Sequence, residues 1–221
     1  MRDSNPSIAD RIASIREELT PEVTLVAVSK TRPNASIQDA MEVDQLDFGE
    51  NRVQELQEKE AALPKSIRWH QIGHLQTNKV KAIVPFVHLI HAVDSERLLV
   101  EIDRRAKNHG RTVDALLQVH IAQEDMKFGW QAPDLTRFIE GNALAGLEHV
   151  RIRGLMGMAT FTPDHQQVAR EFKELRLLYE SLLVSNPSWD TLSMGMSGDW
   201  RIAIDEGSTM IRVGSSIFGG R

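Results

Sequence analysis

Short apolar runs alternate with longer amphipathic segments along most of this chain. The runs that predict strands cover Thr24–Lys30, Leu46–Glu50, Trp69–Gly73, Val87–Val93, Ala115–Ala122, Arg153–Ala159, Thr191–Ser197 and Met210–Phe218. Several of these runs are too continuously apolar to have one face in water. Strands of this kind are typical of parallel sheets that are covered on both faces.

The segments between the runs carry apolar residues at helical spacing. The clearest helical patterns extend over Ser95–Asn108 and Asp164–Leu183. Before the first strand, Ser7 and Asp10 resemble a capping box, and the helix that they begin is closed by Pro21. The chain therefore begins with a helix that precedes the regular alternation of strands and helices.

Eight strands separated by helices, without hairpin signals, indicate right-handed βαβ units. The economical closure of eight such units is a (β/α)8 TIM-type barrel, here α/β with an extra N-terminal helix. An open doubly wound sheet is the alternative architecture. Because no Pro/Gly/Ser-rich linker divides the sequence, residues 1–221 are predicted to form a single domain.

The composition excludes several classes of function. The formal net charge of −5 argues against binding to a phosphate backbone, so no nucleic-acid partner is expected. The basic stretch Arg104–Arg111 is read as a solvated helix end, with Gly110 as its C-cap. The absence of cysteine excludes disulfides and thiolate chemistry. No apolar stretch has the length of a membrane span and the N-terminus lacks a signal-peptide pattern, so a cytoplasmic protein without membrane contact is expected.

Lys30 ends the first predicted strand, an unusual place for an ammonium group. In a barrel, the carboxyl ends of the strands and the loops that follow them form the face that holds the site. A desolvated lysine loses part of its preference for the charged form, and its neutral amine can attack a carbonyl group. The other reading is a lysine that has left the sheet and points into water.

The segment Ser193–Asp199 leaves the seventh predicted strand and enters a short helical stretch, Trp200–Glu206. A helix start exposes unpaired N–H groups that can bind an anion, and Ser197 adds a hydroxyl. Barrels frequently hold a phosphate in the loops after strands seven and eight. Alternatively, Ser197 or Asp199 satisfies these donors as an ordinary N-cap.

The segment that follows, Met210–Gly219, combines three further candidates. Gly214 allows close approach of the backbone to a ligand, and Ser215 supplies donors. Arg212 alternates with apolar neighbours, so its guanidinium needs a buried partner or a ligand atom. An ion pair with Asp205 or Glu206 is the alternative role for Arg212.

Histidines four residues apart, His70 and His74, raise the question of a zinc site. Gln71 stands where the general base of a zincin would be, and Gly73 argues against a helix, so no metal is expected. His70 is read as a histidine satisfied inside the barrel, whereas His74 is placed near the site. Asn51, at the end of the second strand, either caps the next helix or contacts a ligand.

Taken together, the motifs Ala27–Lys30, Phe48–Asn51, Trp69–Lys79 and Ser193–Gly219 resemble those of the pyridoxal phosphate homeostasis proteins. These are single-domain relatives of the N-terminal barrel of alanine racemase. The resemblance extends from about Ser7 to the end of the sequence. One departure is Gln71, where relatives usually carry an apolar residue.

This resemblance implies that Lys30 forms a Schiff base with the cofactor pyridoxal 5′-phosphate (PLP). Ser197, Gly214 and Ser215 are then expected to hold the phosphate, and Arg212 to face the pyridine nitrogen. Asn51 and His74 are assigned near the cofactor on weaker grounds. An arginine at the pyridine nitrogen disfavours its protonation and weakens the ring as an electron sink.

Three functions are compatible with this pattern. The favoured one is a PLP carrier and regulator without strong catalytic activity, a monomer that meets PLP-dependent apoenzymes only transiently. The alternative is an amino-acid racemase, but the related racemases take a catalytic tyrosine from a second domain, and the only tyrosine here, Tyr179, lies on the apolar stripe of a helix. The third is an interaction protein that keeps the barrel without the cofactor.

Overall fold

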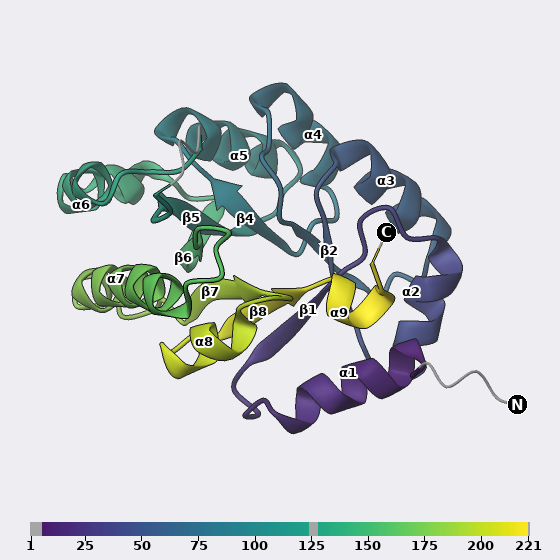
Figure 1. The fold of residues 1–221 in the computed structure, drawn as a ribbon. Coiled ribbons are helices and arrows are strands. Elements are labelled where there is room, and N and C mark those ends of the chain that lie inside the picture. The colour runs from purple at the N-terminus through teal and green to yellow at the C-terminus, as the bar shows by residue number, and fades with distance from the viewer. Residues whose placement is uncertain (1–5, 124–127, 221) are drawn as a thin grey trace, which may run out of the picture.

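The eight predicted strands form a closed, all-parallel barrel with helices around its outside (Figure 1). The computed structural model describes residues 6–123 and 128–220. The first strand pairs with both the second and the eighth, which closes the sheet and rules out the open doubly wound alternative. The predicted (β/α)8 barrel with an extra N-terminal helix is confirmed.

The strands follow one another around the barrel in sequence order. They are β1 (Thr24–Val28), β2 (Asp47–Glu50), β3 (Arg68–Gln71), β4 (Leu89–Val93), β5 (Val113–His120), β6 (Val150–Met158), β7 (Thr191–Met196) and β8 (Met210–Val213).

The helices cover the outer face of the strands. They are α1 (Ile8–Glu17), α2 (Asn34–Met41), α3 (Val53–Ala62), α4 (Val80–Ile83), α5 (Glu96–Asn108), α6 (Ala132–Glu140), α7 (His165–Leu183), α8 (Trp200–Asp205) and α9 (Ser215–Phe218), with short 3-10 turns at η1 (Thr77–Lys79) and η2 (Ala143–Gly146). The capping box before α1 is confirmed: the Asp10 N–H donates to Ser7 Oγ at 3.1 Å, and the Ser7 N–H donates to Asp10 Oδ2 at 2.9 Å.

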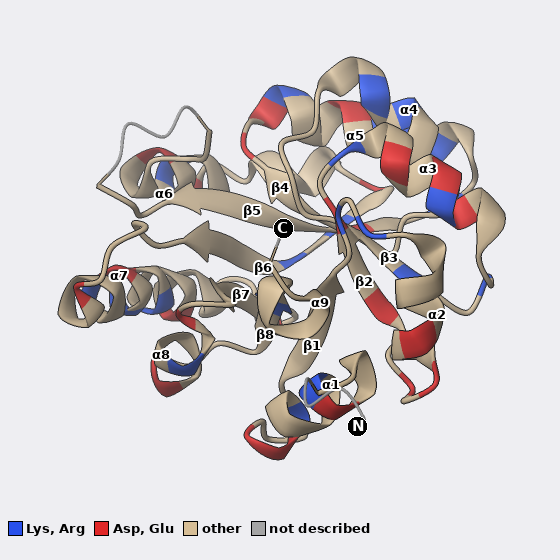
Figure 2. Cartoon of the chain, turned by 45° about the vertical axis from the view of Figure 1, so that its right-hand side comes forward, with Lys and Arg blue, Asp and Glu red and all other residues tan. Residues whose placement is uncertain are grey.

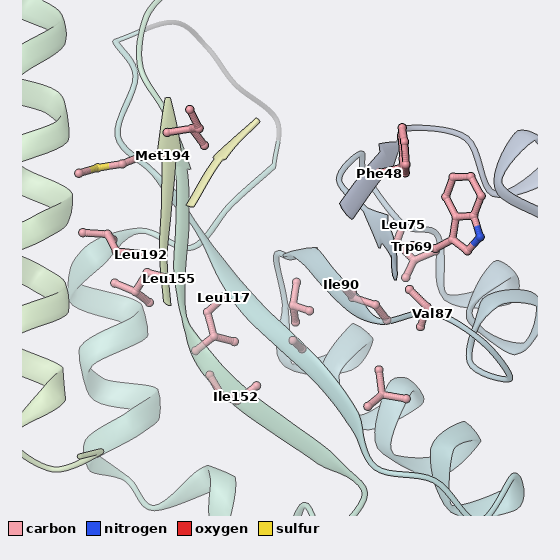
Figure 3. Close-up of a cluster of buried hydrophobic side chains, with 14 of the residues drawn as sticks. Phe48, Trp69, Leu75, Val87, Ile90, Leu117, Ile152, Leu155, Leu192 and Met194 are labelled. Atoms are coloured by element: carbon pink, nitrogen blue, oxygen red, sulfur yellow. The ribbon is translucent and has the colours of Figure 1, made fainter. Parts of the chain in front are cut away.

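Alternation along each strand sends side chains either outward to the helices or inward to the barrel axis. In β1, Leu25 and Ala27 belong to the large cluster between barrel and helices, whereas Val26 belongs to a smaller, separate cluster inside the barrel. Figure 3 shows part of the outer layer, in which the rings of Phe48 and Trp69 lie 6.1 Å apart. Burial on both faces explains why the strands read as continuous apolar runs.

Most strand ends differ from the predicted ones by one to three residues, and the first and eighth strands show the differences that matter for the site. The first strand ends at Val28 rather than Lys30, and the eighth at Val213 rather than Phe218. Ser215–Phe218 is a helical turn, α9, because the chain leaves the sheet at Gly214. Ile217 and Phe218 are apolar because they are buried under α1, where the Arg11 guanidinium donates to the Ile217 carbonyl at 2.9 Å.

Charged residues of both signs are interspersed along the outer helices (Figure 2). The predicted basic helix end is found at the end of α5, where Arg104 and Arg105 pair with Glu101. His109, not Gly110, is the C-cap, and Gly110 follows it with a left-handed φ of 61°. Within residues 6–123 and 128–220, no helix is both long and apolar enough to cross a membrane.

Candidate functional site

A cavity of about 740 Å³ opens at the carboxyl end of the barrel strands. All six residues predicted for the cofactor site line it: Lys30, Asn51, Ser197, Arg212, Gly214 and Ser215. They come from the ends of β1, β2, β7 and β8 and from the turns that follow. His74 lines the same cavity.

Lys30 lies two residues beyond the end of β1 and is exposed. Of the two readings of Lys30, the one in which the lysine has left the sheet describes its position, because β1 ends at Val28 and the chain turns after Ser29. In this turn Thr31 has a left-handed φ of 63°, and its N–H donates to Glu55 Oε1 at 2.6 Å. A β-branched residue rarely adopts this conformation, so the surrounding contacts must hold it there.

A buried ion-pair network behind this turn provides those contacts. Lys59, from α3, donates to Glu50 Oε1 and Glu55 Oε1 at 2.7 Å each and to the Ser29 carbonyl at 2.8 Å. The Ser29 hydroxyl donates to Glu50 Oε1 at 2.6 Å. Burial raises the pKa of Glu50, although the hydrogen bonds from Lys59 and Ser29 act in the opposite direction. The network fixes Ser29 and Thr31, the two neighbours of Lys30.

Ser197 joins the two loops that were predicted to hold a phosphate. Its hydroxyl oxygen accepts the N–H of Gly214 at 3.0 Å and, more weakly, the N–H of Ser216 at 3.5 Å. It does not cap α8. A Cβ at Gly214 would lie 3.2 Å from the Val28 carbonyl, so this position leaves little room for a larger residue. The backbone N–H groups of Gly214 and Ser216 thus converge on one side of the cavity, where Ser197 Oγ accepts both of them.

Arg212 is buried on the inner face of β8, and its side chain lines the cavity. Its Nη2 donates to the Gly157 carbonyl at 3.0 Å, and its Nη1 donates to Ser193 Oγ at 2.5 Å. The predicted need for a buried partner is confirmed, but these partners replace the alternative pair with Asp205 or Glu206. Burial lowers the pKa of Arg212 to about 10, so the guanidinium stays charged at neutral pH.

Asp199 lines the same cavity as Arg212 and interacts with its charge. Burial raises the pKa of Asp199, whereas the hydrogen bond from the Met196 N–H and the charge of Arg212 oppose that rise. Its Oδ1 accepts the Met196 N–H at 2.5 Å, which fixes the turn between β7 and α8. Asp199 therefore shapes the loop that carries Ser197.

Asn51 and His74 line the cavity from the segments that follow β2 and β3. Asn51 does not cap α3, which begins after Arg52. The buried side chain of Gln71 donates to the Asn51 and Gly73 carbonyls at 3.1 Å each. His74 Nδ1 lies 2.9 Å from Asp94 Oδ2, and its ring stacks on Phe128 with centroids 3.8 Å apart.

His70 and His74 do not share a site. As predicted, His70 is buried inside the barrel, where it contacts Asp47 and His91 rather than His74. Asp47, His70 and His88 lie close enough together for a metal ion, but the carboxylate of Asp47 is already engaged by two donors of Arg68.

Sequence reasoning missed the apolar wall of the cavity, formed in part by Ile72, Phe128, Met158 and Val168. Each of these residues reads as ordinary core in its own segment. Met158 and Val168 carry a weak signal, since they flank the loop after the sixth strand. The wall gives the cavity an apolar side facing the polar side of Ser197 and Arg212, as is usual for small-molecule sites.

The family described as "Alanine racemase, N-terminal domain" matches residues 5–221. The pyridoxal phosphate homeostasis protein of Vibrio alginolyticus is 36% identical in an alignment 208 residues long, which covers 91% of this chain and 88% of that protein. This chain belongs to the pyridoxal phosphate homeostasis protein family.

Solved structures extend the comparison. PipY of Synechococcus elongatus PCC7942, solved with PLP bound, is 40% identical to this family member, with a TM-score of 0.87 and coverage of 96% of this chain and 100% of that chain. An alanine racemase from Clostridium difficile 630 has a TM-score of 0.74 at 14% identity and covers 97% of this chain and 60% of that chain. The racemase shares the barrel fold.

Proposed function

We propose that this protein binds PLP reversibly on Lys30 as a carrier and regulator of the cofactor's free level, and thereby influences amino-acid and keto-acid balance. The observation that carries the proposal is the convergence of an amine, a cluster of N–H and hydroxyl groups and a guanidinium on one cavity of about 740 Å³. PLP presents an aldehyde, a phosphate and a ring nitrogen, one group for each of these.

The donor set suits each part of the cofactor. Lys30 would hold the aldehyde carbon through a C=N bond, with the aldehyde oxygen released as water. Ser197, Gly214 and Ser215 would supply hydroxyl and backbone donors to the phosphate, with a phosphate oxygen taking the place of Ser197 Oγ as the acceptor of the Gly214 N–H. Lys30 is exposed, so the aldehyde can reach it.

Arg212 sets the chemical character of the site. PLP supplies an electron sink when its ring nitrogen is protonated. A guanidinium that stays charged repels a proton at a nearby ring nitrogen, and Arg212 is held in its charged form at neutral pH. The side chain therefore favours storage of the cofactor over activation of a bound amino acid.

A racemase is the second candidate, and His74 is the residue that favours it. A two-base racemase needs a second acid or base besides the lysine, and His74 lines the same cavity as Lys30, with its Nδ1 2.9 Å from Asp94 Oδ2. Tyr179 does not serve in this role, since it packs on Trp189 and the hydrophobic core.

The carrier is also proposed to be a monomer in the cytoplasm that meets PLP-dependent apoenzymes transiently.

Absorption spectra and alanine turnover distinguish these functions. PLP added to the purified protein should produce a Schiff-base band at one equivalent, and the loaded protein should interconvert the alanine enantiomers no faster than free PLP does. Sustained turnover that Lys30→Ala abolishes would establish the racemase instead. A protein that stays colourless would be an interaction protein built on the barrel.

A further inference from the structure

A line of buried polar side chains crosses the interior of the barrel and ends at Arg212. Asp47 Oδ1 lies 3.0 Å from His70 Nε2, His70 Nδ1 lies 2.9 Å from His91 Nε2, and His91 Nδ1 lies 3.3 Å from Ser193 Oγ. Ser193 Oγ accepts from Arg212 at 2.5 Å. These five side chains come from β2, β3, β4, β7 and β8, and each is less than 10% exposed.

The two ends of this line fix the position of every hydrogen within it. Arg212 can only donate, so the Ser193 oxygen accepts from it and the Ser193 hydroxyl hydrogen goes to His91 Nδ1. His91 then carries its hydrogen on Nε2 and donates to His70 Nδ1. By the same reasoning, His70 carries its hydrogen on Nε2 and donates to the carboxylate of Asp47.

The charges at the two ends agree with this direction. The guanidinium of Arg68 donates to both carboxylate oxygens of Asp47, and Arg68 and His70 together lower the pKa of Asp47 against the effect of its burial. Burial lowers the pKa of His91 well below its ordinary value, and the charge of Arg212 acts in the same direction. The line therefore runs from a cation to an anion through a neutral His91.

The reverse arrangement leaves a buried hydroxyl unsatisfied. If His70 were protonated, its Nδ1–H would donate to His91, and His91 would have to donate to Ser193. Ser193 Oγ would then accept two hydrogen bonds, and its own hydrogen would have no acceptor among the side-chain contacts of the described residues, which are those to Arg212 and His91. An unpaired buried hydroxyl is costly, so the direction from Arg212 to Asp47 is favoured.

We propose that Ser193, His91, His70 and Asp47 are positioning residues that hold Arg212 in one orientation toward the cofactor. This role rests on the proposed function, but the hydrogen-bond chain itself can be tested without any ligand. The chain also links the two ends of the barrel, since Asp47 and His70 border a second cavity of about 370 Å³ at the amino end of the strands.

The first test determines the position of the histidine hydrogens in the protein without PLP. Long-range nitrogen–proton NMR spectra of protein with isotope-labelled histidine distinguish the two neutral tautomers from the charged ring, and the signals are assigned through His91→Gln and His70→Gln. We expect both histidines to be neutral at pH 7, with the hydrogen on Nε2. A hydrogen on Nδ1 of either ring, or a charged His70, would contradict the proposed direction of hydrogen bonding from Arg212 to Asp47.

The second test measures Arg212 through the bound cofactor. Ser193→Ala removes the acceptor of Arg212 Nη1, so the pH midpoint of the absorption change of PLP-loaded protein should shift by about one unit. Ser193→Thr, which keeps the hydroxyl, should restore the midpoint. Ser208→Ala is the matched control, because Ser208 is also buried, between β7 and β8, but donates only to backbone carbonyls.

The outcomes of the two tests separate the chain from the proposed function. Equal midpoints in Ser193→Ala and Ser208→Ala would show that Ser193 does not position Arg212. If Ser193→Ala does not fold, the comparison of Ser193→Thr with the wild-type protein decides, and a midpoint that moves despite the hydroxyl contradicts the proposal. Failure of the wild-type protein to bind PLP would contradict the proposed function, while the NMR spectra would still show whether the hydrogen-bond chain from Arg212 to Asp47 exists.

Discussion

The position of Lys30 is determined by residues that do not line the cavity. The turn after β1 is held by the buried contacts of Lys59 with Glu50, Glu55 and the Ser29 carbonyl. Glu50 has no exposed surface, and its second oxygen, Oε2, has no hydrogen-bond partner among the described residues. The network is therefore sensitive to the loss of a single cation.

Replacing Lys59 by methionine should destabilise the protein by about 3 kcal/mol at neutral pH, because Glu50 would remain as an unpaired buried charge. Burial already raises the pKa of Glu50, so its protonated form is favoured in the fold and the stability linked to that proton is lost as pH rises. The loss in Lys59→Met should therefore be smaller near the ordinary pKa range of glutamate than at pH 7. Urea unfolding at several pH values measures both effects.

The control for this variant is Lys65→Met. Lys65 pairs with Glu60, but its side chain is 70% exposed, so the change should stay within about 0.5 kcal/mol. Equal losses in the two variants, or a loss in Lys59→Met that does not change with pH, would contradict the role of the buried network.

Single residues were predictable from sequence where their local pattern was anomalous. Lys30 follows an apolar run, and Arg212 interrupts one, so both stood out. Asp47, His91 and Ser193 did not, because their partners lie on other strands, up to 102 residues away in sequence. Hydrogen bonds across a barrel interior depend on strand register, which the apolar pattern does not specify.

Elements were predicted more securely than their ends. Burial on both faces of the sheet produces apolar runs that mark all eight strands, but Ile217 and Phe218 extend the eighth run into α9 because both are buried there. The structure also contains a bulge in β6 that the run Arg153–Ala159 conceals. Ala115 pairs with Ile152 and Leu116 with Gly154, which leaves Arg153 as the extra residue.

Gly154 is required by this bulge. It has a left-handed φ of 146°, and a Cβ there would lie 1.9 Å from the Thr191 carbonyl oxygen of β7. Gly154→Ala should destabilise the protein by about 3 kcal/mol, since strain and overpacking both act at this position. Thermal unfolding should show a clear decrease in Tm, whereas Gly146→Ala, where no atom lies within 4 Å of the new Cβ, should change Tm little. An unchanged Tm in Gly154→Ala would mean that β6 and β7 separate easily at the bulge.

At the scale of the whole molecule, closure of the barrel brings the two ends of the chain's sequence together. Because β1 pairs with β8, Lys30 in the turn after β1 lines the same cavity as Ser197, Gly214 and Ser215. The same closure surrounds the polar line from Asp47 to Arg212 with eight strands and excludes water from most of it. The architecture thus places the amine of Lys30 and the loops of Ser197 and Gly214 around one cavity.

The most direct test of the account is chemical mapping of the amine that holds PLP. Wild-type protein incubated with PLP should, after borohydride reduction and proteolysis, yield one modified peptide with the cofactor on Lys30. Lys30→Ala should lose this adduct yet retain weaker binding through the phosphate, and Lys81→Ala, at an exposed lysine outside the cavity, should keep the adduct. Modification of a different lysine, or an adduct that survives in Lys30→Ala, would contradict the assignment of the site.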